Sequence, residues 1–221
     1  MIVKSRYTLK WLTLAVTLYA TVCMLHWPIG FTFFTQLSNL FAAAVAAAQL
    51  KKSTPLLHTL KYMAVLSLFI TFLVYLTAIA SLYPGGLVAA YLQDHGASFC
   101  MHLLNPALVI TDFYLHDAKQ PYSRMHILLG LLPMLFYLAF LLILGRLGLW
   151  WHGGMAAPYP FLNYLAPAGW FGFRPETAGF TTFGIGVFYV ILLLLVAFGL
   201  LSFLQWKLAG FTEKTAGISI P

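Results

Sequence analysis

The chain has 221 residues, of which 62% are hydrophobic and only 8% are charged. A water-soluble domain usually carries about a quarter charged residues, so this composition excludes an ordinary soluble protein and indicates an integral membrane protein. The net charge of +7 does not indicate nucleic-acid binding, because the basic residues are predicted to lie in short loops between apolar segments.

Six apolar segments are long enough to cross the hydrocarbon layer of a bilayer, which takes about 20 helical residues. They lie approximately at residues 10–29, 33–50, 61–83, 98–117, 126–146 and 181–206. The predicted fold is therefore an all-α integral membrane protein, a six-transmembrane-helix bundle that forms a single domain over residues 1–221.

The distribution of lysine and arginine predicts the orientation, because cytoplasmic loops are enriched in both. Of the 12 basic residues, ten lie on the side of the chain termini: Lys4, Arg6, Lys10, Lys51, Lys52, Lys61, Lys119, Arg124, Lys207 and Lys214. Only Arg146 and Arg174 lie on the other side. Both termini are predicted to be cytoplasmic, in a multi-pass protein of the cell membrane.

The second apolar segment opens with polar side chains and continues with very small ones. Thr35, Ser38 and Asn39 share one face if the segment is helical. The stretch 42–48 that follows is alanine except for one valine. Polar residues at the start of a helix, followed by small residues along it, fit a helix in the middle of a bundle, where neighbouring backbones approach closely.

The fourth apolar segment carries the most intramembrane polarity. His102, Asn105, Asp112 and His116 fall within an arc of about 80° on a helix, so they form one stripe. Exposing this stripe to lipid would cost several kcal/mol, and it is expected to face the bundle interior. Pro106 removes a backbone donor one turn after His102 and is expected to bend the helix.

The predicted topology puts Thr35 and His102 at a similar depth. Both segments run from the outside inward, and each of these residues lies near the start of its segment. A hydroxyl is a poor nucleophile without a base, and an imidazole in reach would supply one. The alternatives are that Thr35 caps a helix, that Ser38 and Asn39 only join helices, and that His102 is a packing residue.

Two other functional classes compete with this interpretation. The 14-residue separation of His102 and His116 suits a helix that ligates two b-type haems, but no other segment holds a matching histidine pair. A transporter or channel that uses Asp112 is the other class, although the segments lack the repeated glycine- and proline-broken helices of many carriers. Asp112 lies about 15 Å beyond His102 along the helix, so an ion pair or interhelical hydrogen bond is its expected role.

The segment between the last two predicted helices, residues 147–180, is long and rich in glycine, proline and aromatic residues. Its aromatic side chains suit the headgroup level of a bilayer. Loops of this length are usually functional or disordered, and one so apolar is not expected to be disordered. We interpret it as a re-entrant or lid segment on the outer face.

Four short motifs stand in order along most of the chain: Phe34-Thr35, Ser38-Asn39, His102 with Pro106 and later Asp112, and Tyr159-Pro160-Phe161-Leu162. With these motifs the chain resembles a family of six-span membrane proteins that includes the androgen-induced protein and the androgen-dependent regulator of tissue factor pathway inhibitor. It is more similar to the bacterial branch, the predicted six-transmembrane proteins. Animal members are threonine hydrolases that cleave fatty acid esters of hydroxy fatty acids. The resemblance implies Thr35 as the nucleophile and His102 as its base.

The resulting hypothesis is a membrane-embedded lipid ester hydrolase whose site faces the outer leaflet and needs no metal or cofactor. The nearest alternative is a lipid acyltransferase with the same dyad, and a non-catalytic carrier of lipids or small molecules is the alternative from another class. The expected supporting residues are the oxyanion donors or substrate contacts Ser38, Asn39 and Asn105, the chamber-closing aromatics Tyr159 and Phe161, and the polar residue Asp112.

Overall fold

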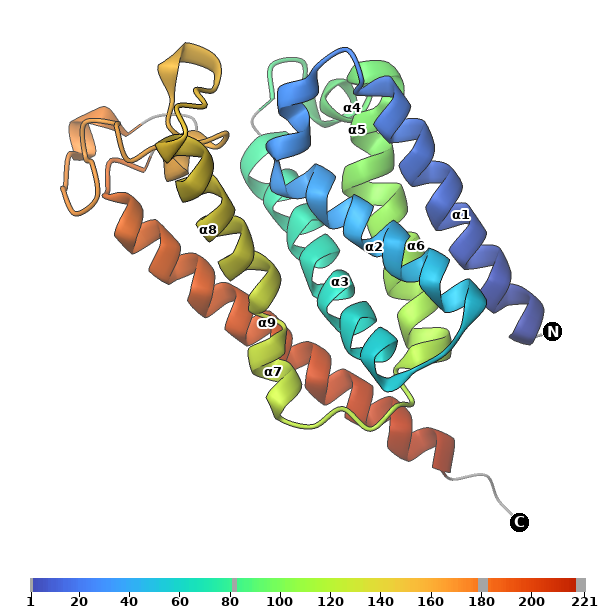
Figure 1. The fold of residues 1–221 in the computed structure, drawn as a ribbon. Helices are drawn as coiled ribbons and strands as arrows, with labels where there is room; N and C mark the ends of the chain where they lie inside the picture. The colour runs from blue at the N-terminus through green and yellow to red at the C-terminus, as the bar shows by residue number, and fades with distance from the viewer. Residues whose placement is uncertain (1, 81–82, 179–182, 218–221) are drawn as a thin grey trace. The chain divides into compact units, whose positions relative to one another are not determined.

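The structure is a computed structural model that describes residues 2–80, 83–178 and 183–217. Within these ranges the regular elements are helices, accompanied by two isolated β-bridges, which confirms the all-α class (Figure 1). The chain divides into two compact units, Met1–Pro133 with Gly199–Pro221 and Met134–Phe198. Each unit is described by itself.

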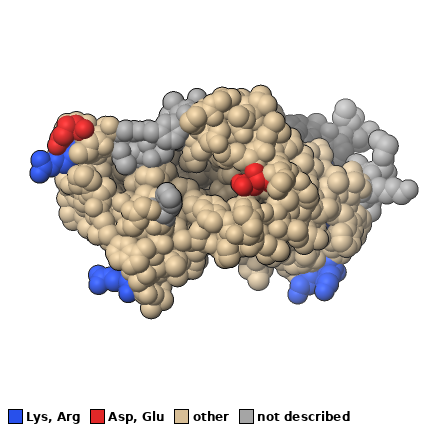
Figure 2. All heavy atoms as spheres, turned by 90° about the horizontal axis from the view of Figure 1, so that it is seen from above, with Lys and Arg blue, Asp and Glu red and all other residues tan. Residues whose placement is uncertain are grey.

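Three helical stretches of the described chain are long and apolar enough to cross a membrane, Pro55–Thr77, Met125–Arg146 and Val187–Thr212. They indicate a membrane protein. On the face drawn in Figure 2, few lysine, arginine, aspartate or glutamate side chains are seen. Helices also occupy the other three predicted segments, but a bundle of six spans stays a prediction. Residues 81–82 and 181–182 of the predicted spans lie outside the described residues.

The first unit is built from four long helical segments joined by short turns. Its main elements are α1 (Ile2–Cys23), η1 (Pro28–Thr32), α2 (Phe34–Lys51), α3 (Pro55–Val74), η2 (Tyr75–Ile79), α4 (Gly86–Tyr91), η4 (Asp94–Gly96), α5 (Ala97–Phe99), η5 (Cys100–Leu104), α6 (Asn105–Asp112), η6 (Phe113–Asp117) and α7 (Met125–Leu129). The segment predicted at 98–117 is thus helical throughout and contains two π-helical turns, η5 and η6.

The small residues of α2 let the helices of the first unit pack closely. α2 packs against α1 and α3, and α6 packs against the same two helices (Figure 1). Ala42 and Ala46 are both 0% exposed. The buried core around them includes Tyr62, Leu68, Val109 and Phe113. This packing holds the starts of α2 and of the fourth segment side by side.

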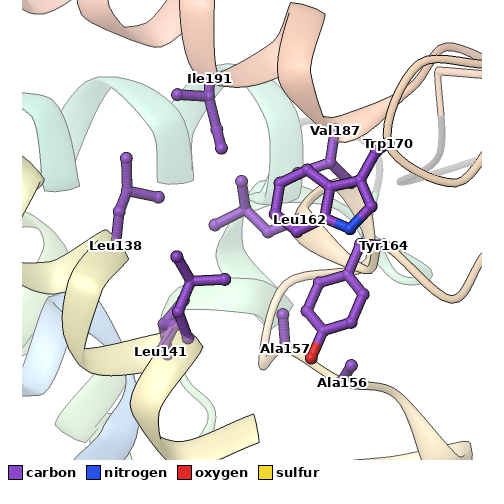
Figure 3. A pocket seen from close by; sticks show the side chains of 10 residues that line it. Leu138, Leu141, Ala156, Ala157, Leu162, Tyr164, Trp170, Val187 and Ile191 are labelled. Atoms are coloured by element: carbon purple, nitrogen blue, oxygen red, sulfur yellow. The ribbon is translucent and has the colours of Figure 1, made fainter. Parts of the chain in front are cut away.

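The second unit contains most of α8 (Leu132–Arg146), the first part of α9 (Val187–Gly217), and the aromatic segment between them. That segment has three short 3-10 turns, η7 (His152–Gly154), η8 (Pro160–Leu162) and η9 (Pro175–Thr177). Tyr164 and Trp170 stack with ring centroids 5.1 Å apart. They line a small apolar pocket with Leu138, Leu141 and Ile191 (Figure 3).

Candidate active site

His102 lies in a widened turn of the fourth helical segment. Pro106 has no N–H, and in a regular α-helix its ring would clash with the carbonyl of residue 102. The chain instead makes the π turn η5, in which the Asn105 N–H donates to the Cys100 carbonyl. Such turns are frequent at functional sites. Pro106 therefore explains locally why His102 leaves the regular helical register.

Thr35 is the second residue of α2, and its hydroxyl faces this histidine. Thr35 Oγ1 lies 3.3 Å from His102 Nε2, and both side chains are partly buried. This distance is long for a hydrogen bond from a hydroxyl, but catalytic hydrogen bonds are often long before a substrate binds. The two residues singled out in the sequence thus lie in direct contact, although they are 67 positions apart.

The second ring nitrogen of His102 determines which nitrogen faces Thr35. His102 Nδ1 lies 2.9 Å from the Ser98 carbonyl oxygen. A carbonyl only accepts hydrogen bonds, so a neutral ring carries its proton on Nδ1. Nε2 then presents a lone pair to the Thr35 hydroxyl, which is the arrangement that a general base requires.

Aromatic rings hold the imidazole in place. The Tyr75 ring stacks on His102 with centroids 3.7 Å apart. The Tyr75 hydroxyl donates to the Ala90 carbonyl at 2.7 Å and lies 2.6 Å from Ser98 Oγ. Tyr91 packs against Tyr75 at 5.2 Å, and burial raises the pKa of the Tyr91 hydroxyl, so this wall is uncharged. The sequence did not single out Tyr75 or Ser98.

Ser38 and Asn39 bind the backbone around Thr35. The Ser38 hydroxyl donates to the Thr35 carbonyl at 3.0 Å. Asn39 Nδ2 donates to the same carbonyl at 2.8 Å and to the Met101 carbonyl at 3.2 Å. Asn39 therefore joins the start of α2 to the helix of His102, and both of its N–H groups already have acceptors.

Asn105 extends the same network to α1. Its Nδ2 donates to Asn39 Oδ1 at 2.6 Å and to Thr17 Oγ1 at 3.0 Å. Asn105 is 0% exposed. The donors of the three predicted oxyanion residues are thus all engaged, and those of Asn39 and Asn105 join helices.

Gln36, the residue after Thr35, is a buried polar residue that the sequence did not single out for the site. It is 3% exposed, and its Nε2 has no hydrogen-bond partner among the described residues. Gln36 follows Thr35 directly in the first turn of α2, so the two side chains leave the helix in directions about 100° apart. An unpaired buried amide is costly and indicates a donor kept for another group.

Asp112 lies at the other end of the fourth segment and forms a buried ion cluster. Its Oδ2 lies 2.5 Å from Lys10 Nζ and 2.7 Å from Lys61 Nζ. Its Oδ1 lies 3.1 Å from His116 Nδ1. Lys10, Lys61 and Asp112 are at most 1% exposed. Asp112 therefore ties α1, α3 and α6 together by ion pairs.

This cluster corrects one premise of the predicted orientation. Lys10 and Lys61 were counted as loop residues that mark the cytoplasmic side, but the structure buries both inside helices. They pair with Asp112 because an unpaired ammonium inside a low-dielectric core is very costly. Without these two, 10 − 2 = 8 of the 12 basic residues support the predicted orientation.

The predicted chamber-closing residues belong to the second unit. Tyr159 and Phe161 stack with ring centroids 5.2 Å apart, and Tyr159 also packs against Tyr137 at 6.4 Å. They form an aromatic layer on the segment after α8. Closure over an acyl chain stays a prediction.

Both histidines of the stripe have a hydrogen-bond partner at each ring nitrogen. His116 contacts Asp112 through Nδ1 and the Ser5 hydroxyl, at 3.0 Å, through Nε2. His102 likewise uses both ring nitrogens. Across the described residues, no group of three histidine, cysteine, aspartate or glutamate side chains is placed to hold a metal ion.

No family model, curated protein or solved structure matches the chain. The chemistry of the site therefore follows from its own side chains, and the resemblance seen in the sequence stays a hypothesis. These side chains bring a hydroxyl into contact with an imidazole, and the amides of Asn39 and Asn105 next to them are engaged.

Proposed function

We propose that the protein is a membrane-embedded hydrolase of fatty acyl esters, in which Thr35 is the nucleophile and His102 its general base. The observation that carries this proposal is the 3.3 Å contact between Thr35 Oγ1 and His102 Nε2, together with the Ser98 carbonyl that holds the ring proton on Nδ1. A base oriented by a third group beside a hydroxyl is the general arrangement of an activated nucleophile.

The reaction follows from this arrangement. Thr35 Oγ1 attacks the acyl carbonyl carbon while His102 Nε2 takes the hydroxyl proton. The same imidazolium then donates that proton to the leaving alcohol, and an acyl-threonine remains. Water, activated by His102 in the same way, releases the fatty acid. Fatty acid esters of hydroxy fatty acids are the substrates that the resemblance favours, and the outer leaflet of the cell membrane is the proposed side of entry.

Gln36 supplies the oxyanion donor in this proposal. The donors of Ser38, Asn39 and Asn105 are engaged, whereas Gln36 Nε2 is buried and unpaired. The first helical hydrogen bond of α2 is donated by Leu37, and the N–H groups of Thr35 and Gln36 precede it in the first turn of the helix. Such N–H groups stabilise a developing negative charge.

Gln36→Leu should lower kcat by about 10²-fold to 10³-fold with little change in KM, because one donor to the transition-state oxyanion is lost. Steady-state hydrolysis of a fatty acyl ester in detergent micelles measures this. Ser38→Ala is the comparison, and it should change kcat by less than about 10-fold. The assignment of Gln36 is wrong if Ser38→Ala has the larger effect.

Covalent labelling tests the proposed function itself. An alkyl fluorophosphonate should phosphonylate Thr35 in the purified protein, since Oγ1 displaces fluoride while His102 removes the proton. Mass spectrometry of the digested protein should locate the adduct on the peptide that contains Thr35, and Thr35→Ala and His102→Ala should both lose it. If that peptide stays unmodified while the protein hydrolyses acyl esters, Thr35 is not the nucleophile.

A further inference from the structure

A second histidine at the opposite end of the first unit also joins a hydroxyl to a carboxylate. His58 Nε2 lies 2.9 Å from Ser53 Oγ, and His58 Nδ1 lies 3.1 Å from Asp117 Oδ1. The order hydroxyl, Nε2, Nδ1, carboxylate is that of a Ser–His–Asp triad, which is recognised by geometry and not by sequence position. The site is separated from Thr35 by the whole of α2, which has 18 residues and is about 27 Å long.

A buried carboxylate faces Nδ1 of this ring. Asp117 is 0% exposed and His58 is 9% exposed. A carboxylate accepts hydrogen bonds, so it favours the His58 tautomer with the proton on Nδ1 and leaves the Nε2 lone pair to Ser53. The Nδ1 contact is close but bent, and it falls short of a formed hydrogen bond. Poor alignment of this kind is common in catalytic groups before substrate binds.

The chain places Ser53 at a helix N-terminus, where the side chain is exposed. Ser53 is exposed and directly precedes Thr54, the N-cap of α3, whose hydroxyl accepts the Leu57 N–H at 3.3 Å. Pro55 is the first helical residue and has no N–H. The following N–H, of Leu56, has no acceptor within its own helix. Beside a reacting Ser53 it offers a donor and the positive end of a 20-residue helix.

Asp117 reaches His58 through the second π turn of the fourth segment. η6 spans Phe113–Asp117, and the Ala118 N–H donates to the Phe113 carbonyl at 2.8 Å. The wide turn places Asp117 against His58 and Asp112 against two lysines, and Asp117 Oδ2 also lies 3.9 Å from Lys10 Nζ. Gln49 Nε2 also donates to Asp117 Oδ1, at 3.4 Å.

A second serine, histidine and aspartate make the same order of contacts as Ser53, His58 and Asp117, but their serine is less accessible. Ser5 Oγ lies 3.0 Å from His116 Nε2, and His116 Nδ1 lies 3.1 Å from Asp112 Oδ1. Ser5, however, lies within α1 and is half-buried. The carboxylate of this set, Asp112, is paired closely with two lysines, whereas Asp117 has a lysine contact at 3.9 Å. The Ser53 set differs in its exposed hydroxyl and its helix N-terminus.

We propose that Ser53, His58 and Asp117 form a second acyl-transfer site, in which Ser53 is the nucleophile, His58 the general base and Asp117 the positioning residue. Its substrate class is an anionic acyl ester or thioester that approaches from water, because Ser53 is exposed and follows two exposed lysines, Lys51 and Lys52. This proposal is independent of the one for Thr35.

The step balances without any co-reactant except water. Ser53 Oγ bonds to the acyl carbon, and its proton passes to His58 Nε2. The C–O or C–S bond of the acyl donor then breaks, and the leaving group takes that proton. Water attacks the acyl-serine in the second half, with His58 accepting its proton and returning it to Ser53. The products are a carboxylic acid and an alcohol or thiol.

An alkyl fluorophosphonate tests the proposal on the full chain in the Thr35→Ala background. The peptide that contains Ser53 should gain the phosphonyl group, and His58→Ala should slow this labelling at least about 100-fold, as loss of a general base does. Ser5→Ala should label at the unaltered rate, and Lys119→Ala serves as a surface control. Absence of the adduct, or equal labelling of His58→Ala, overturns the proposal. Because adducts at Thr35 and Ser53 lie on different peptides, failure at one site is distinguishable from failure at the other.

Two acyl donors distinguish the possible sources of the acyl group. Palmitoyl-coenzyme A should release free thiol, and vesicles of phosphatidylglycerol should release lysolipid and fatty acid. A signal that disappears in Ser53→Ala identifies the soluble thioester or the phospholipid as the source. If neither donor gives a Ser53-dependent product, the assigned substrate class is wrong. Size-exclusion profiles of all variants confirm that they are folded.

Discussion

Replacing Thr35 by alanine should reduce kcat/KM for fatty acyl esters on the order of 10³-fold or more, because the attacking oxygen is removed. His102→Ala should reduce it about 10²-fold to 10⁴-fold, since the Thr35 hydroxyl then has no base. The double variant should be no slower than the slower single variant, because the 3.3 Å contact makes the two residues one functional unit. Initial rates of fatty acid release in detergent micelles measure all three variants.

A threonine without an imidazole provides the control. Thr71 is 4% exposed, and its hydroxyl lies 3.1 Å from Ser38 Oγ. Thr71→Ala should therefore leave kcat/KM within about 10-fold, as expected for a group outside the reacting pair. Thr35→Ser keeps the hydroxyl and should keep measurable turnover. Full activity of Thr35→Ala, or additive losses in the double variant, would contradict the dyad.

The Thr35–His102 pair was predictable because helical periodicity is a local property. Thr35, Ser38 and Asn39 were expected on one face of a helix over 33–50, and α2 begins at Phe34. The predicted topology then placed His102 at a depth in the bilayer similar to that of Thr35, so the two side chains were expected to be within reach of each other. The π turn η5 was not predicted in form, although Pro106 indicated a disturbance there. The missing N–H of a proline indicates that the regular helix is disturbed there. Whether a kink or a π turn forms depends on the packing around it.

An ion pair or interhelical hydrogen bond of Asp112 was expected, and the structure shows ion pairs. Its lysine partners, and the approach of Asp117 to His58, were missed because these residues are remote in sequence. Lys10 and Asp112 are 102 positions apart, and Lys61 and Asp112 are 51 apart. A lysine near the end of an apolar segment reads as a topology signal unless a buried carboxylate is known to face it. The sequence likewise offered no reason to select Asp117, because its contact with His58 depends on the second π turn.

Asp112→Ala should cost about 3–5 kcal/mol of unfolding free energy, the cost typical of breaking a buried ion pair. The substitution leaves two ammonium groups, of Lys10 and Lys61, that are at most 1% exposed. The nearest remaining carboxylate contact is Lys10 Nζ to Asp117 Oδ2 at 3.9 Å, which is too long for a charge-assisted hydrogen bond. Unfolding in mixed micelles of increasing denaturing detergent, followed by circular dichroism, measures the loss.

The cost comes from the charges left unpaired and not from the volume removed, and a compensated variant separates these causes. Replacing the whole set, as Lys10→Met, Asp112→Leu and Lys61→Met together, removes all three buried charges and keeps their volume. Because an apolar replacement of a buried ion cluster is often neutral or stabilising, this variant should be more stable than Asp112→Ala despite two additional changes. The electrostatic account fails if the triple variant loses as much stability as the single one. Its failure would assign the loss to the hydrogen bonds between Asp112 and its neighbours, which His116→Ala would then reproduce in part.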